Sequence, residues 1–207
     1  MEDLKLGSGY HSKKVDMPRI FIIVWIVSGL WIISEIGLAI FTHSSKRKDV
    51  SSQEQTSLRR LWLIIIPCTI LGGFWCVQSV GLIRFARYYV MYSGLVLMIL
   101  GLVIRGKAIY TLRKYFTVDV SIVKDHKIIN TGEYKFIRHP AYAGSLLTFF
   151  GLGWALGNWV SFIIIFFPIL WAFMRRMNTE EKTLLASLGE EYASYMKTTK
   201  RLIPKIY

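Results

Sequence analysis

Residues 124–142, KDHKIINTGEYKFIRHPAY, contain most of the side chains in this 207-residue chain that could carry out chemistry. The segment is polar and basic, includes His126, and ends in Arg138-His139-Pro140 directly before a long apolar run. An ionisable cluster at the edge of an apolar run would lie at a membrane surface, where desolvation and neighbouring charges tune protonation. The simpler alternative is that Arg138 is an interfacial anchor and Pro140 begins the next helix.

A second mixed-charge cluster, Arg175, Arg176, Glu180 and Glu181, follows the last apolar run. Arg176 and Glu180 are four residues apart and share a helix face, but an isolated surface pair of that kind contributes less than about 1 kcal/mol. An arginine fork suits a carboxylate ligand, and Glu181 or His139 could take a proton from an amine or phenol. Two such clusters on one membrane face favour a functional site over two separate anchors.

The composition is that of an integral membrane protein. Hydrophobic residues make up 53% of the chain, too many for an ordinary soluble domain of this size. The net charge of +13 comes from basic residues between apolar runs, which speaks against a nucleic-acid partner. Cys68 and Cys76 lie about 12 Å apart along a helix, too far for a disulfide within it. Neither has the spacing of a metal site, so we expect no metal.

The apolar runs predict an all-α protein with about five transmembrane helices. They cover residues 18–41, 61–83, 88–104 and 143–173. The last run is too long for one untilted span, and Gly157-Asn158 offers a turn near its middle, so two tightly connected helices are expected there. The short connector between the second and third runs predicts an antiparallel helical hairpin.

The charge distribution predicts the orientation of these spans. With five spans, the connectors 42–60 and 105–142 and the tail from residue 175 lie on one side and carry 20 of the 26 Lys and Arg residues. The positive-inside rule makes this side cytosolic and places the N-terminus outside.

We therefore divide the chain into residues 1–104, with three spans, and a core of residues 105–207. In that core the 105–142 loop and an amphipathic C-terminal helix would form a cytosolic cofactor pocket. The helix has an apolar face that Tyr192 and Tyr195 continue, formed by Leu184, Leu185 and Leu188.

Glu35 lies inside the first apolar run, about two turns before its end. A carboxylate within a span is a functional candidate by default. One this close to the end could instead reach interfacial water, and both readings remain open.

The C-terminal half resembles the isoprenylcysteine carboxyl methyltransferase family. The resemblance covers roughly residues 110–207 and depends on separated motifs occurring together. These are a His before two aliphatic residues, Gly-x-Tyr, Arg-His-Pro-x-Tyr, the paired Glu, Gly-Glu-x-Tyr-x-x-Tyr and a closing Arg-x-x-Pro. The resemblance implies an integral membrane methyltransferase that uses S-adenosylmethionine and acts on a lipophilic acceptor.

The same resemblance implies roles for individual residues. Arg176 would bind the acceptor, and Arg138 would orient the acceptor or hold the site together. Asp119 aligns only loosely with a pocket position. The cofactor pocket would be formed by His126, Lys127, Ile128, Ile129, Tyr134, His139, Pro140, Ala141, Tyr142 and Glu180. Tyrosine faces and a carboxylate suit a sulfonium and an ammonium group.

Several functions remain open at this point. A carboxylate acceptor such as isoprenylcysteine needs no general base, so direct in-line transfer is the simplest mechanism. Other lipid acceptors, including phospholipid amines, fit the same cofactor pocket. An NADPH-dependent reductase of the sterol type would need groups for the cofactor's phosphates and a larger bundle. A non-enzymatic membrane protein would tolerate alanine at Arg138, His139 or Glu180.

Overall fold

The structure is a computed structural model that describes residues 19–42, 52–78, 80–112 and 128–207. In these residues it is helical, with no strands beyond two isolated bridges, which confirms the all-α prediction. The elements in order are α1 (Arg19–Thr42), α2 (Ser52–Trp75), α3 (Arg87–Leu112), the short 3-10 helix η2 (Gly132–Lys135), α4 (Pro140–Ala155), α5 (Trp159–Leu188) and α6 (Glu190–Thr198).

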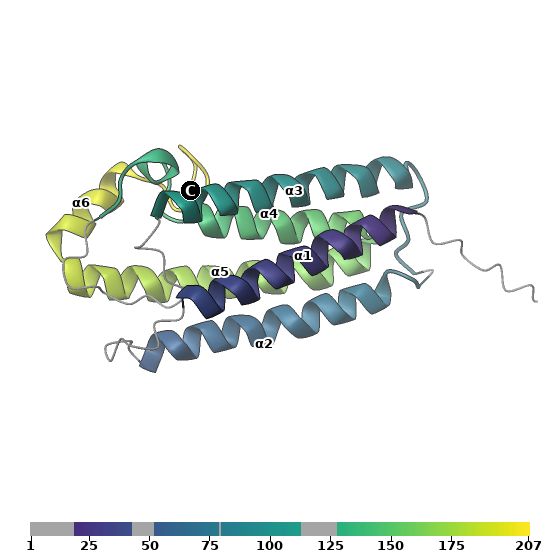
Figure 1. Cartoon of the computed structure of the whole chain (residues 1–207), viewed down its shortest axis with the longest axis horizontal. Helices are drawn as coiled ribbons and strands as arrows, with labels where there is room; N and C mark the ends of the chain where they lie inside the picture. The colour runs from purple at the N-terminus through teal and green to yellow at the C-terminus, as the bar shows by residue number, and fades with distance from the viewer. Residues whose placement is uncertain (1–18, 43–51, 79, 113–127) are drawn as a thin grey trace, which may run out of the picture.

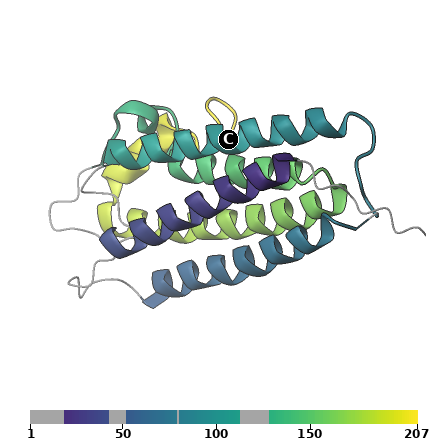
Figure 2. The same cartoon turned by 45° about the vertical axis from the view of Figure 1, so that its right-hand side comes forward.

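The helices α1 to α5 lie side by side and alternate in direction (Figures 1 and 2). One end of the bundle, the site end, gathers the C-terminal ends of α1, α3 and α5, the N-terminal ends of α2 and α4, and the whole of α6 (Figure 1). The N-terminal end of α1 lies at the opposite end (Figure 1). The helix ends that border the connectors 42–60 and 105–142 therefore lie together at the site end, and the side of the membrane that this end faces stays a prediction.

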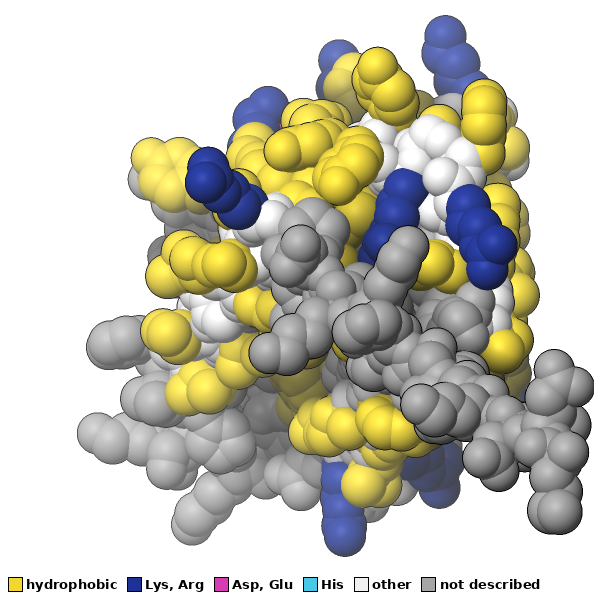
Figure 3. Space-filling model, turned by 90° about the vertical axis from the view of Figure 1, so that its right-hand side faces the viewer, with side chains coloured by type: hydrophobic (Ala, Val, Ile, Leu, Met, Phe, Trp, Pro, Cys, Tyr) yellow, Lys and Arg dark blue, Asp and Glu magenta, His cyan; other side chains and the backbone are white. Residues whose placement is uncertain are grey.

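The outer surface of the bundle is apolar. Within the described residues α1, α2, α3 and α5 contain stretches long and apolar enough to cross a membrane. Outward side chains such as Ile33, Ile70 and Val103 are more than half exposed, as expected where lipid is the solvent. At the opposite end, Lys and Arg side chains project from among hydrophobic ones (Figure 3). The chain is a multi-pass integral membrane protein.

The helix α4 is shorter than the others. Its 16 residues reach about 24 Å, somewhat less than the ~30 Å hydrocarbon core. It lies inside the bundle, where most of its side chains are buried. The fifth span is thus present as a helix, and whether it crosses the whole bilayer stays a prediction.

Glycines allow α3 and α4 to approach each other closely. A Cβ at Gly94, Gly101, Gly144 or Gly151 would lie within 2.3 to 2.6 Å of the backbone of the facing helix. Such contact between small residues is the usual way in which membrane helices pack tightly. It fixes α4, and the polar segment that precedes it, relative to α3.

Asn158 organises the turn between α4 and α5. Its Oδ1 accepts hydrogen bonds from the backbone N–H groups of Val160 (2.9 Å) and Ser161 (3.3 Å) and caps α5. Its Nδ2 donates to the carbonyl of Val80 at 2.9 Å, in the connector between α2 and α3. Gly157 has φ +62° and supplies the turn's left-handed residue. The predicted turn at Gly157-Asn158 is confirmed.

The predicted hairpin of the second and third spans is wrong. The helix α2 packs against α5, and α3 packs against α4. The connector hydrogen-bonds to the α4–α5 turn instead, with Ile83 N–H donating to the Gly157 carbonyl at 3.0 Å. Because the connector is held at that turn, α2 and α3 pack against different helices and not against each other.

The predicted loop at 105–142 begins too early, because α3 continues to Leu112. The boundary between residues 104 and 105 therefore lies inside a helix. Arg105 pairs with Glu35 across the bundle, and Ala108 is fully buried beside Tyr134 and Ala141. Both contacts favour two further turns of helix beyond the apolar run.

The C-terminal amphipathic helix is also divided differently from the prediction. The helix α5 extends past the apolar run to Leu188, and Gly189, at φ +54°, separates it from α6. Leu185 is 42% exposed whereas Tyr192 is 4% exposed, so the predicted apolar face is not continuous.

Candidate functional site

The Arg138-His139-Pro140 segment forms the start of α4. His139 is the N-cap residue and Pro140 the first helical residue, where its missing N–H is not needed. The C-terminal segment lies beside it. Backbone N–H groups of Arg138 and His139 donate to the carbonyls of Lys200 (2.7 Å) and Arg201 (3.1 Å). The end of the chain is thereby held against the candidate site.

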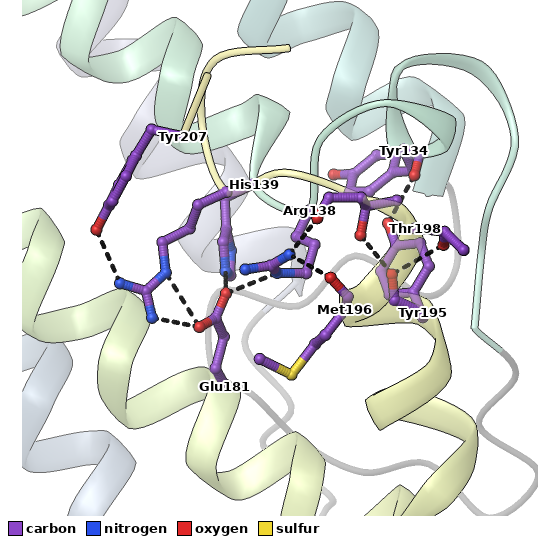
Figure 4. A network of polar contacts seen from close by, with 10 residues as sticks. Tyr134, Arg138, His139, Glu181, Tyr195, Met196, Thr198 and Tyr207 are labelled. Atoms are coloured by element: carbon purple, nitrogen blue, oxygen red, sulfur yellow. Dashed lines mark hydrogen bonds and ion pairs between the residues drawn. The ribbon is translucent and has the colours of Figure 1, made fainter. Parts of the chain in front are cut away.

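Glu181 is the centre of a buried ion cluster that these segments bring together (Figure 4). Its Oε1 accepts from Arg138 Nε at 2.8 Å and lies 3.1 Å from His139 Nε2. Its Oε2 accepts from Arg201, with Nε at 3.0 Å and a second, shorter bond from Nη2. The Glu181 carboxylate raises the pKa of Arg201 above its ordinary value through these hydrogen bonds.

Arg138 also holds the end of α6. Its Nη1 donates to the carbonyls of Thr199 (2.6 Å) and Met196 (3.3 Å), which the helix ladder leaves without partners. Tyr195 of α6 donates from its hydroxyl to the Tyr134 carbonyl at 2.7 Å. Burial raises the pKa of Tyr195 to about 12, although Arg138 lowers it in part, so the hydroxyl remains a neutral donor.

A second set of contacts links Arg176, Tyr142 and Glu180. Arg176 Nε donates to the Tyr142 hydroxyl at 2.9 Å, and that hydroxyl donates to Glu180 Oε2 at 2.7 Å. The Tyr142 ring stacks on His139, with centroids 5.4 Å apart and an interplanar angle of 10°. The predicted helix-face pair of Arg176 and Glu180 is thus bridged by a tyrosine from α4, and Arg176 is 4% exposed.

Arg176 lines two cavities. The larger, about 970 Å³, lies between α2 and α5 and includes the basic side chains of Arg60, Arg175 and Lys182. The smaller, about 70 Å³, is the interior cavity. The interior cavity is lined by Trp31, Glu35, Leu58, Leu61, Trp62, Ile65, Arg105, Tyr142, Ser145, Phe149, Phe173 and Arg176. Arg176 therefore lies between a basic, outward cavity and an interior one.

The structure brings most of the predicted site residues to one end of the bundle. Arg138, His139 and Glu181 form the ion cluster, and Arg176, Tyr142 and Glu180 form the second set. Pro140, Ala141 and Tyr134 are buried beside them, whereas Ile128 and Ile129 are partly exposed. His126, Lys127 and Asp119 lie outside the described residues.

Sequence reasoning missed Arg201 as a member of the ion cluster and Arg105 as the partner of Glu35. Arg201 is the arginine of the closing Arg-x-x-Pro motif, which was a usable signal. Arg105 is the charged residue that ends the third apolar run, and Glu35 carries the opposite charge in the first. Their pairing could have been proposed from those two positions.

Comparison with known proteins supports one family. A protein-S-isoprenylcysteine O-methyltransferase of Schizosaccharomyces pombe is 30% identical over 69% of this chain and 64% of its own length. The chain thus spans slightly less than two thirds of that relative. Protein-S-isoprenylcysteine O-methyltransferase B of Arabidopsis thaliana is 32% identical over 83% of this chain and 86% of its own length.

A solved structure and a family model agree with these relatives. The structure of a eukaryotic intramembrane Ras methyltransferase, an isoprenylcysteine carboxyl methyltransferase, superposes with a TM-score of 0.64 at 26% identity, covering 93% of this chain and 70% of that one. The sequence model of the isoprenylcysteine carboxyl methyltransferase family matches residues 94–186, a range that contains Arg138, Arg176 and the paired Glu180 and Glu181 but not Arg201. The chain belongs to the isoprenylcysteine carboxyl methyltransferase family.

Proposed function

We propose that this protein transfers a methyl group from S-adenosylmethionine to the carboxylate of an isoprenylcysteine at the membrane surface. The observation that carries the proposal is the chain of hydrogen bonds from Arg176 through the Tyr142 hydroxyl to Glu180, in which Arg176 and Tyr142 line the interior cavity. This arrangement places the Arg176 guanidinium, which suits the acceptor's carboxylate, near the Glu180 carboxylate, which suits the cationic methyl donor. Relatives named for this reaction support the choice of acceptor.

The residues present fit S-adenosylmethionine. Glu180 is partly exposed, and its carboxylate can accept from an ammonium or a ribose hydroxyl. The stacked rings of His139 and Tyr142 offer a flat surface for adenine or for a sulfonium cation. When bound, the cofactor would supply a methyl group already activated by its sulfonium sulfur.

The chain's own residues would bind and align the acceptor. A guanidinium has five N–H donors, so Arg176 can hold Tyr142 and an acceptor carboxylate together. A carboxylate nucleophile carries no proton to remove, so Glu181 is not required as a base and can remain within its ion cluster. Exclusion of water by the surrounding helices favours a reaction in which opposite charges neutralise each other.

The site end would face the cytosol. Support comes from its share of basic residues, 20 of 26 in the whole chain. The cofactor would then enter from the aqueous side, and the acceptor's lipid would enter sideways between the helices.

Calorimetric titration of the detergent-solubilised protein with S-adenosylhomocysteine tests the cofactor assignment, with NADPH titrated in parallel. We expect saturable binding of S-adenosylhomocysteine alone. Glu180→Ala should weaken it at least about tenfold through loss of a charged hydrogen-bond acceptor, whereas Glu191→Ala, on the exposed face of α6, should not. Binding of NADPH alone, or of neither ligand by a folded sample, would overturn the proposal.

A further inference from the structure

The larger cavity that Arg176 lines, here named the α2–α5 cavity, has no other role in the proposed reaction. Its volume is about 970 Å³, near the upper end of the roughly 300 to 1,000 Å³ that small-molecule sites span. Its walls come from the first half of α2 and the last half of α5, which lie at the site end (Figure 1). The cavity is therefore large enough for a ligand and lies where the helices leave the apolar layer.

Three exposed cations line this cavity, Arg60 from α2 and Arg175 and Lys182 from α5. None of the described lining residues is Asp or Glu. In the part of the chain that the structure describes, Arg60 and Lys182 form no ion pair, and the Arg175 guanidinium lies over the Trp171 ring, 5.2 Å from its centroid. The lining is thus positive and lacks a carboxylate, so it suits an anion.

The lining changes from polar to apolar along the two helices. Toward the middle of the bundle the walls are formed by Leu61, Ile64 and Trp171. Toward the site end they include hydroxyl groups, among them those of Ser57 and Ser187. A soluble anion has no use for the apolar part, whereas a phospholipid has both a polar and an apolar part to match it.

The cations lie at the depth of lipid phosphates. Arg60 directly precedes the apolar run 61–83, and Arg175 follows the run 143–173 by two residues. Lys182 lies two helical turns beyond Arg175, about 10 Å farther along α5. The three side chains therefore begin where the apolar layer ends and reach into the headgroup region.

We propose that the α2–α5 cavity binds the headgroup of an anionic phospholipid. Arg60 and Arg175, one from each helix, would hold the phosphate oxygens, because a guanidinium fork matches phosphate geometry. Lys182 would add a third positive charge, and the acyl chains would lie along the apolar wall. Basic pockets between membrane helices bind anionic lipid headgroups in this way. A bound lipid would then join α2 to α5, which pack against each other.

The lipid site is assigned to Arg60, Arg175 and Lys182 alone. Arg176 lines the same cavity, but it contacts Tyr142 and belongs to the proposed active site. The inference therefore does not depend on methyl transfer.

The test measures ligand binding to the delipidated full chain in a non-ionic detergent by native mass spectrometry. Dioleoylphosphatidylglycerol is the anionic lipid, dioleoylphosphatidylcholine has the same acyl chains without net charge, and glycerol phosphate is a soluble phosphate. We expect phosphatidylglycerol to bind at least about tenfold more tightly than phosphatidylcholine, and glycerol phosphate at least about tenfold more weakly, because it lacks acyl chains. Equal affinity for the two lipids, or for phosphatidylglycerol and glycerol phosphate, would overturn the inference.

A triple variant, R60Q/R175Q/K182Q, tests the location of the site. It should bind phosphatidylglycerol and phosphatidylcholine within about threefold of each other, because the charges that distinguish the two lipids are gone. The matched control K135Q/K197Q/K200Q removes three exposed positive charges near α6 and should keep the parent's preference. An equal loss in both variants would mean that the lipid is attracted by net charge and not by this cavity.

The double variant R60Q/K182Q keeps the test decisive if the triple variant does not fold. It changes exposed side chains only and leaves Arg175 on Trp171. It should weaken phosphatidylglycerol binding at least about threefold, and an unchanged affinity would refute the site. Preferential binding of an oligoglutamate peptide would refute the lipid and indicate an acidic segment of a partner protein. None of these results depends on whether the protein transfers a methyl group.

Discussion

Glu181 has four polar contacts with three basic side chains, in a position that is 4% exposed. Both of its oxygens are used in holding Arg138, His139 and Arg201. Through them the carboxylate connects α5 with the start of α4 and with the C-terminal segment. A catalytic role for Glu181 or Arg138 stays a prediction, and the contacts give both residues a structural role first.

We expect Glu181→Gln to destabilise the protein by about 3 to 5 kcal/mol, because it leaves buried guanidinium groups without their counterion. Thermal unfolding in detergent measures the change, with Glu191→Gln in α6 as the exposed control. If the two variants unfold at the same temperature, the cluster does not hold the site together.

Tyr142→Phe keeps the ring on His139 and removes the hydroxyl between Arg176 and Glu180. Loss of two charge-assisted hydrogen bonds should lower kcat/KM for the acceptor at least about tenfold and weaken S-adenosylhomocysteine binding in the same direction. Steady-state kinetics and calorimetry give the two values. Tyr89→Phe, on the exposed face of α3, is the matched control, and parent-like values for Tyr142→Phe would exclude the hydroxyl from the site.

At the scale of elements, the pair α3–α4 is the scaffold of the site. Gly101→Ala would place a Cβ 2.5 Å from the Thr148 backbone nitrogen, whereas Gly106→Ala, on the same helix, meets nothing within 4 Å. We expect Gly101→Ala to lower stability by about 1 to 3 kcal/mol, the usual cost of overpacking, and Gly106→Ala to be neutral or slightly stabilising. Equal unfolding temperatures would mean that the helices separate without cost.

Apolar runs predicted where helices exist but not where they end. Gly157-Asn158 revealed its turn because these residue types favour a turn locally. Arg105 and Arg176 suggested helix ends that the structure does not have, because a charged residue ordinarily ends a membrane span. Each is instead bound by a distant residue, Glu35 or Tyr142, and the helix continues through it. Such partners lie 70 and 34 positions away in the chain, beyond the reach of a local pattern.

At the scale of the whole molecule, the site end and the N-terminal end of α1 lie at opposite ends of the bundle (Figure 1). The orientation is tested in a protein whose Cys68 and Cys76 are replaced by alanine. Single cysteines are introduced at two exposed positions, Arg84 in the connector between α2 and α3 and Lys197 in α6. We expect a membrane-impermeant maleimide to label the Arg84→Cys protein in intact cells, and the Lys197→Cys protein only after permeabilisation. The reverse pattern would place the site outside the cytosol.

The sequence predicted which residues belong to the site better than it predicted which of them contact each other. Motif resemblance named Arg138, His139, Tyr142, Arg176, Glu180 and Glu181, and the structure brings these six residues to one end of the bundle. The contribution of Arg201 depends on the C-terminal segment folding back beside residues 136–139, an arrangement set by tertiary contacts. The Glu35–Arg105 pair likewise needed the packing of α1 on α3.

The central claim is carboxyl methylation, and the chemistry of the product tests it most directly. The purified protein in lipid vesicles is incubated with radiolabelled S-adenosylmethionine and either farnesylcysteine, its carboxamide or phosphatidylethanolamine. The account predicts label that is released as methanol by mild base, from farnesylcysteine only, and its loss in Arg176→Ala. Base-stable label on phosphatidylethanolamine, or equal label on the carboxamide, would contradict it.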